Sequence, residues 1–238
     1  MPRSLTTSEV VRLRADPAGL AQDLARPMPR RPSEAARRGT RFHAWVQDMF
    51  ADRPLIAVDD LDAGGTPPDA ELDRLKVAFE RSEYAGIRPH RVEAPFQLLA
   101  GGHLIRGRID AVYRAGSLPS GAGAPAGAAV GVNTGYDQSA GAPAGAAWEV
   151  IDYKTGRRPR DSAAADLQLA IYRLAWAGIA GVALEQVSAG FLYVATGQVV
   201  RPAGLPDLAG IIALLDRAGA PGATPSHQQE DTPRLPAG

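Results

Sequence analysis

Two strand-forming segments that flank a long low-complexity stretch constrain the fold of this chain more than any other feature. Residues 103–114 (HLIRGRIDAVYR) and 148–156 (WEVIDYKTG) alternate their side chains with the period of two that is typical of β-strands. Residues 115–147 between them are rich in Gly and Ala and contain the heptad GAPAGAA twice. Such a composition buries too little apolar surface to offset its ordering entropy. We therefore predict that the two strands pair across a flexible insertion.

The remaining segments predict an α/β fold with a central mixed β-sheet flanked by helices. Thr6 and Glu9 match a capping box, so a short helix is expected to begin near residue 7. Further helices are expected at residues 16–26, 34–50, 69–84, 166–178 and 205–219, and further strands at 91–99 and on both sides of 195–197. Buried helix stripes are predicted at Phe42, Val46, Met49 and Phe50, and at Leu72, Leu75 and Phe79. In the strand 103–114, the residues Ile105, Gly107, Ile109 and Ala111 are expected to share one face.

The composition excludes several functional classes. Cysteine is absent, which rules out disulfides, thiolate metal sites, iron–sulfur clusters and Cys nucleophiles. The 26 basic and 26 acidic residues give no net charge that points to a membrane or to nucleic acid. No apolar run of membrane-spanning length and no signal-peptide core are found, so we expect a cytoplasmic protein without a membrane partner. Motifs of P-loop motors, zinc peptidases and Ser hydrolases are absent as well.

One of the only two lysines in the chain marks the candidate site. Asp152 and Lys154 share a face of the predicted strand, about 6.5–7 Å apart along the chain. If the strands pair across the insertion, Asp110 converges with Asp152, and two close carboxylates favour a hard divalent cation such as Mg²⁺ or Mn²⁺. An ammonium beside that cation can orient or help to deprotonate a water, whereas an arginine stays protonated. The other lysine, Lys76, lies in an ordinary amphipathic helix.

Four motifs in this order resemble the PD-(D/E)XK nucleases of the RecB-like branch: RRGTRFHAW at 37–45, GRID at 107–110, DYK at 152–154 and QLAIY at 168–172. Over roughly residues 5–217 the chain is similar to the C-terminal nuclease domain of actinobacterial UvrD-type helicase–nucleases of the AdnAB kind. The resemblance implies a restriction-endonuclease-like core. It places the nuclease domain at 34–217 with the flexible insertion 115–147, after N-terminal helices and an Arg/Pro connector at 1–33 and before a disordered tail at 218–238.

The resemblance also implies a role for each motif residue. His43, Asp110, Asp152 and the backbone carbonyl of Tyr153 are expected to bind Mg²⁺ or Mn²⁺, and Lys154 is expected at the attacking water. Asp110, Asp152 and Lys154 are thus the expected catalytic residues. DNA contact, or support of the metal ligands, is expected of Gln168, Tyr172, Arg108, Arg38, Arg41 and Glu93.

These expectations define a function and leave alternatives open. The predicted activity is metal-dependent hydrolysis of DNA phosphodiesters by the nuclease module of a helicase–nuclease that processes double-strand breaks. Its partners would be single-stranded DNA or broken ends, and a helicase motor in a longer polypeptide or a partner chain. RNA cleavage remains open, and so does a catalytically silent module that binds DNA or a helicase. In a purely structural alternative, Asp110 and Asp152 pair with Arg106 and Arg108, and the Arg-rich segment 29–45 is a solvated surface.

Overall fold

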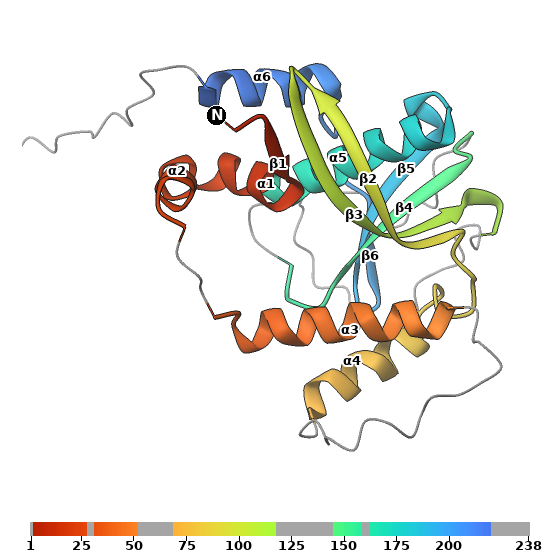
Figure 1. The fold of residues 1–238 in the computed structure, drawn as a ribbon. Coiled ribbons are helices and arrows are strands. Elements are labelled where there is room, and N and C mark those ends of the chain that lie inside the picture. Colours follow the sequence, from red (N-terminus) through yellow and green to blue (C-terminus); the bar gives the residue numbers. More distant parts are fainter. Residues whose placement is uncertain (1, 28–30, 52–68, 118–144, 159–161, 220–238) are drawn as a thin grey trace, which may run out of the picture.

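The computed structural model describes residues 2–27, 31–51, 69–117, 145–158 and 162–219, whose strands form one six-stranded mixed sheet between two layers of helices (Figure 1). This confirms the predicted α/β, restriction-endonuclease-like fold class. The strands are β1 (Ser4–Thr6), β2 (Arg91–Ala100), β3 (His103–Arg114), β4 (Trp148–Lys154), β5 (Val187–Tyr193) and β6 (Gln198–Val200). The α-helices are α1 (Thr7–Ala15), α2 (Pro17–Ala25), α3 (Glu34–Phe50), α4 (Ala70–Glu80), α5 (Ala163–Ala180) and α6 (Leu208–Gly219). None of the helices in these ranges is long and apolar enough to span a membrane.

The sheet is arranged around β3, which has two strands on one of its edges. β2 pairs antiparallel with β3 from Arg91 opposite Val112 to Ala100 opposite His103, so it lines one edge of β3 over most of its length. On the other edge, β1 pairs parallel with residues 104–106 and β4 pairs antiparallel with residues 111–114. Residues 107–110 lie between these two ladders and pair with neither strand. The backbone pairing along this edge of β3 is therefore interrupted between β1 and β4, at the GRID motif.

β1 is an element that the sequence pattern did not reveal. Three residues are too few to show an alternation, and this strand exists because it pairs with β3. The predicted capping box follows it directly, since Thr6 and Glu9 each accept a backbone N–H of the other. At Gly107 the junction packs tightly against β3, where a Cβ would lie 2.4 Å from Thr7 Oγ1 and 2.8 Å from the Phe96 ring. A glycine is thus required for β1 and α1 to approach β3 this closely.

The two helical layers bury different sides of the sheet. α3 and α4 cover one side, where Phe42, Val46 and Phe79 pack against β4 side chains such as Tyr153 (Figure 1). α5 covers the other side, together with α1 and α6. The expected burial of Met49 is wrong, because its side chain is 40% exposed and the buried stripe of α3 follows the four-residue spacing of Phe42 and Val46.

The alternation of β3 changes partway along the strand. Ile105 and Ile109 pack in the core on the α5 side, whereas Ala111 packs on the α3 side, so the prediction that they share one face is wrong at Ala111. The change coincides with Glu93 on β2, which has a left-handed backbone with φ of 50°. Val92 pairs with Ala111 and Ala94 pairs with Ile109, which sets Glu93 opposite Asp110. The change in alternation thus lies next to the unpaired residues 107–110 of β3.

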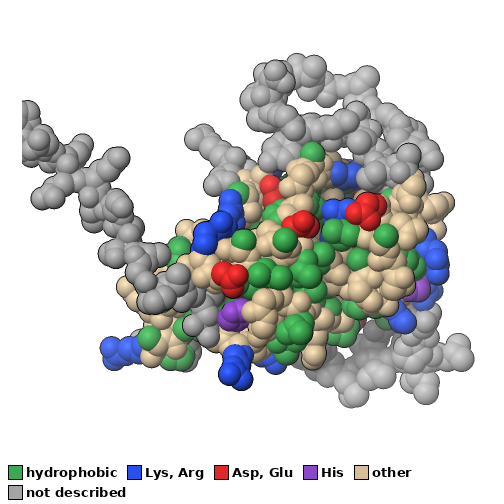
Figure 2. All heavy atoms as spheres, turned by 90° about the horizontal axis from the view of Figure 1, so that it is seen from above, with side chains coloured by type: hydrophobic (Ala, Val, Ile, Leu, Met, Phe, Trp, Pro, Cys, Tyr) green, Lys and Arg blue, Asp and Glu red, His purple; other side chains and the backbone are tan. Residues whose placement is uncertain are grey.

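Some predicted segments differ in extent or lie outside the described residues. α4 ends at Glu80 rather than at Tyr84, since the chain turns there and buries the Tyr84 ring in the core. Residues 118–144 of the predicted insertion and residues from 220 of the predicted tail lie outside the described residues. Figure 2 views the molecule from the α6 side and shows acidic and basic side chains interspersed with apolar ones. This face therefore carries charges of both signs.

Candidate functional site

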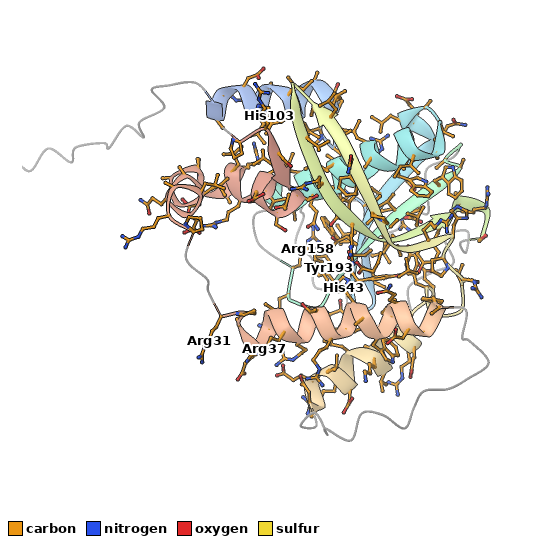
Figure 3. All side chains as sticks on the ribbon, in the orientation of Figure 1. Arg31, Arg37, His43, His103, Arg158 and Tyr193 are labelled. Carbon is orange, nitrogen blue, oxygen red and sulfur yellow. The ribbon has the colours of Figure 1, made fainter. Side chains whose placement is uncertain are left out.

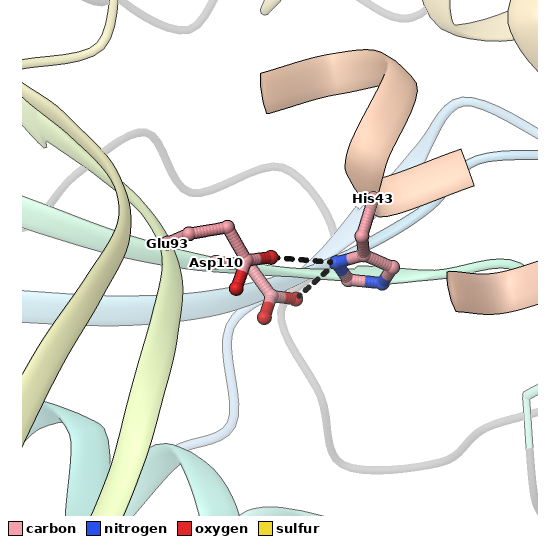
Figure 4. Close-up of side chains that lie close together, drawn as sticks. All are labelled: His43, Glu93 and Asp110. Carbon is pink, nitrogen blue, oxygen red and sulfur yellow. Dashed lines mark ion pairs between the residues drawn. The ribbon is translucent and has the colours of Figure 1, made fainter. Parts of the chain in front are cut away.

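Three side chains from three elements lie close together beside the interrupted edge of β3 (Figure 4). His43 projects from α3, Glu93 from β2 and Asp110 from β3. The Nδ1 atom of His43 lies 3.5 Å from Glu93 Oε1 and 3.6 Å from Asp110 Oδ2. One potential ligand atom from each residue lies within 4.8 Å of the others, so the group has the size of a metal site. The chemistry of this set, one imidazole and two carboxylates, fits a divalent cation.

A second group of side chains surrounds Lys154 at the end of β4. Its Nζ atom lies 2.7 Å from Asp152 Oδ2 and donates a 2.8 Å hydrogen bond to Gln168 Oε1 on α5. Gln168 Nε2 in turn donates to the Tyr172 hydroxyl at 2.9 Å. The ammonium also lies 5.3 Å from the centre of the buried Phe191 ring on β5. Lys154 is therefore held from several sides while its side chain stays 30% exposed.

The backbone of Tyr153 connects the two groups. Its N–H donates a 2.9 Å hydrogen bond to Asp110 Oδ2. In an extended strand the N–H and the C=O of one residue point to the same edge, so the Tyr153 carbonyl also faces the edge of Asp110. The next carbonyl, that of Lys154, faces the opposite edge and accepts from Val194 N–H at 3.0 Å on the β5 side.

Crowding of carboxylates perturbs the protonation of the site. Burial raises the pKa of Asp110 to about 8, and repulsion from Asp152 adds to the increase. Burial alone would lower the pKa of His43, but attraction to Glu93, Asp110 and Asp152 outweighs it and raises that pKa to about 9. A cation that binds among these groups replaces their protons, so metal affinity is expected to rise with pH. Burial also raises the pKa of Tyr172, which keeps its hydroxyl protonated.

Asp152 supplies a further sign that the site fits a cation. The residue is 1% exposed, and its Oδ2 atom receives no hydrogen bond of acceptable geometry besides the ion pair with Lys154. A carboxylate oxygen has two acceptor positions, and buried polar atoms are normally hydrogen-bonded. A divalent cation bound by Asp110 and Asp152 would occupy the remaining acceptor position of this oxygen.

The structure brings some predicted residues to the site and places others elsewhere. His43, Asp110, Asp152, Tyr153, Lys154, Gln168, Tyr172 and Glu93 lie in the two groups described above. Arg108 is exposed on β3 two residues before Asp110. Arg38 and Arg41 are directed to the start of α4, where both pair with Asp69. Figure 3 shows Arg31 and Arg37 near the N-terminal end of α3, away from His43.

The structural alternative for the aspartates does not describe their surroundings. Asp110 takes its contacts from the Tyr153 N–H and from His43, and Asp152 takes Lys154, rather than Arg106 or Arg108. Sequence reasoning did not find Phe191, because nothing but its place in a buried strand singles it out. It also gave Glu93 only a supporting role, although a hairpin turning at residues 101–102 already sets residue 93 opposite residue 110.

Comparison with known proteins finds a similarity to PD-(D/E)XK nucleases in the C-terminal part of the chain. Residues 137–232 match the model of a family described as the PD-(D/E)XK nuclease superfamily. The match includes the DYK and QLAIY motifs. It begins after His43, Glu93 and Asp110, which therefore lie outside it. No curated protein matches the chain significantly. A solved structure described as "Crystal structure of SSO0001" aligns over 92% of this chain and 76% of that one, with 14% identity and a TM-score of 0.35, a likeness too low to support a conclusion.

Proposed function

We propose that this protein is a metal-dependent nuclease that hydrolyses phosphodiester bonds in DNA. The observation that carries the proposal is that two groups adjoin through the backbone of Tyr153: His43 lies beside Asp110, which accepts the Tyr153 N–H, and Lys154 pairs with Asp152 on either side of that residue. These residues come from three separate elements, and their side chains are only partly exposed. A buried group of carboxylates beside one ammonium is costly to maintain for stability alone. Such a group is typical of catalytic sites.

In this proposal the chain's own groups hold the cation and the nucleophile. His43, Asp110, Asp152 and the Tyr153 carbonyl bind Mg²⁺ or Mn²⁺, which when bound polarises the phosphate and lowers the pKa of a water. An ammonium has three N–H donors; that of Lys154 donates one to Gln168 and is paired with Asp152 on a second side. The third remains to orient the attacking water against the phosphorus.

The biological setting follows from the sequence resemblance. We propose that the chain belongs to the RecB-like branch and acts with a helicase motor, in a longer polypeptide or a partner chain, on broken DNA ends in the cytoplasm. The four ordered motifs support this setting. Backbone contacts of the kind that arginines such as Arg108 make would give little sequence preference. A silent binding module has no evident use for a fixed Lys154 beside buried carboxylates, so we favour the enzyme.

The two lysines of the chain allow a matched experiment. The purified chain is incubated with 5′-labelled single-stranded DNA and Mn²⁺, with and without EDTA, as wild type, Asp152→Asn, Lys154→Ala and Lys76→Ala. We expect cleavage by the wild type and Lys76→Ala, and loss of cleavage in EDTA and in the other two variants. Lys76 lies on α4 beside Asp73 and the Trp45 ring, outside the site.

The result can contradict the proposal in two ways. If correctly folded Asp152→Asn and Lys154→Ala cut as fast as the wild type, the assigned site does not perform the reaction. If the wild type binds Mn²⁺ and DNA but cuts neither DNA nor a matched RNA strand, the silent module replaces the enzyme. Preferential cutting of the RNA strand would retain the site and change the substrate.

A further inference from the structure

We propose that Glu93 is a direct ligand of the bound cation, in addition to the ligands that the sequence motifs assign. The inference rests on the proposed function of this site and changes the composition of its metal centre. Glu93 comes from β2, so the centre would take carboxylates from the three adjacent strands β2, β3 and β4. The motif-based set draws carboxylates only from β3 and β4.

In the metal-free protein these contacts are ion pairs of a protonated His43, and the same separations fit three ligands around one ion. His43 Nδ1 lies 3.5 Å from Glu93 Oε1 and 3.6 Å from Asp110 Oδ2. Hydrogen bonds between such atoms measure about 2.7–3.2 Å, so both separations are too long. Two ligand atoms that are each about 2.1 Å from one ion lie about 3 Å apart at right angles and further apart at wider angles. The three atoms therefore have the spacing of ligands around a common centre.

The charges of the site also balance with one divalent cation. Glu93, Asp110 and Asp152 carry three negative charges when ionised, and Lys154 carries one positive charge. With His43 neutral as a ligand, the group is left with two negative charges, which one Mg²⁺ or Mn²⁺ neutralises. Without Glu93 the same ion would leave one positive charge in a largely buried site, where an unbalanced charge is costly.

Two further observations point in the same direction. The buried Oδ2 atom of Asp152 has the ion pair with Lys154 as its only contact in the described residues, which leaves it acceptor capacity for an ion. Glu93 is also the one non-glycine residue with a positive φ in the described ranges, a conformation that such residues adopt rarely. A glycine would suit this backbone better, and a carboxylate opposite Asp110 repels it. The unfavourable backbone of Glu93 and its repulsion from Asp110 are both explained if the Glu93 carboxylate is needed to bind the cation.

Replacement of Glu93 by glutamine and by glycine separates ligation from a structural role. Mn²⁺ affinity is measured by calorimetry on the full chain, and the melting temperature is measured in EDTA. We expect Glu93→Gln and Glu93→Gly to weaken Mn²⁺ binding by at least about tenfold. Loss of a group that only supports a metal ligand already weakens metal binding about 10–100-fold, and loss of a ligand should cost no less. The melting temperature of Glu93→Gly in EDTA should equal or exceed that of the wild type, since glycine relieves the left-handed backbone. Glu34→Gln, on the exposed first turn of α3, is the matched control and should bind Mn²⁺ normally.

A crystal structure with Mn²⁺ and anomalous scattering then decides between direct and indirect contact. We expect the ion within bonding distance of a Glu93 oxygen. An ion bound to His43 and Asp110 but not to Glu93, or unchanged affinity in both Glu93 variants, would overturn this inference and leave the nuclease proposal standing. If Mn²⁺ binds through Glu93 but the wild type cuts no nucleic acid, the nuclease proposal fails and the ligand assignment stands.

Discussion

Replacing Gln168 by leucine tests whether the position of Lys154 sets the rate of cleavage. Gln168 accepts a 2.8 Å hydrogen bond from Lys154 Nζ and donates a 2.9 Å hydrogen bond to the Tyr172 hydroxyl. Leucine has a similar size and a high helix propensity, so α5 should stay intact. The variant removes both hydrogen bonds and leaves Lys154 with Asp152 as its partner.

The size of the effect follows from these contacts. A hydrogen bond to a charged group contributes about 1.5–3 kcal/mol. Each 1.36 kcal/mol changes a rate about tenfold, so complete loss in the transition state would slow cleavage roughly 10–150-fold. The Lys154 side chain is 30% exposed, and water will replace part of the lost contact, so we expect a value near tenfold. Tyr172→Phe keeps the Lys154 contact and removes a neutral hydrogen bond of about 0.5–1.5 kcal/mol, which predicts roughly a 2–10-fold loss.

Steady-state kinetics with saturating Mn²⁺ and single-stranded DNA distinguish positioning from DNA binding. If Gln168 positions Lys154, Gln168→Leu lowers kcat with little change in KM, and Tyr172→Phe does the same to a smaller degree. Gln47→Leu, on the exposed side of α3, is the control and should leave both constants unchanged. A wild-type kcat in Gln168→Leu, or a loss confined to KM, would refute the reasoning and assign Gln168 to DNA contact instead.

Two other predictions concern stability. Gly107→Ala should destabilise the chain by about 1–3 kcal/mol, because its Cβ would clash with Thr7 and Phe96, and thermal unfolding should show a lower melting temperature. Gly178→Ala on α5, where a Cβ meets nothing within 4 Å, should have the opposite sign; equal effects would contradict the packing argument. In EDTA the melting temperature should fall between pH 6 and pH 9, because raised pKa values of about 8 for Asp110 and about 9 for His43 make the folded state bind more protons than the unfolded state. Asp110→Asn should flatten this dependence, and Mn²⁺ should stabilise the wild type more at pH 9 than at pH 6; a pH-independent melting temperature would refute the protonation of the site.

The sequence predicted those parts of the site that depend on local pattern. The alternation of β4 places Asp152 and Lys154 on one face, and helical spacing makes Gln168 and Tyr172 neighbours. The hairpin turn at residues 101–102 also sets Glu93 opposite Asp110, but the left-handed backbone of Glu93 and its approach to His43 depend on the fold and have no local signal.

Parts of the fold that depend on long-range packing were also beyond the sequence. β1 is stabilised by pairing with β3, about a hundred residues away in the chain. The Arg-rich start of α3 left a phosphate contact and a solvated surface open, and in the fold Arg38 and Arg41 pair with acidic residues at the start of α4. Composition shows that arginine side chains are present, but only the fold decides which anionic group each of them contacts.

The position of the site follows from the way in which the β3–β4 ladder ends. The ladder runs from Arg114 opposite Trp148 to Ala111 opposite Ile151. Beyond it, the Tyr153 N–H needs an acceptor, because a buried backbone donor without a partner is costly. The Asp110 carboxylate supplies that acceptor in place of a backbone carbonyl. This contact lies directly beyond the end of the ladder and holds the Asp110 carboxylate against the backbone next to Asp152, so the interruption of the pairing and the candidate metal centre occur at the same place.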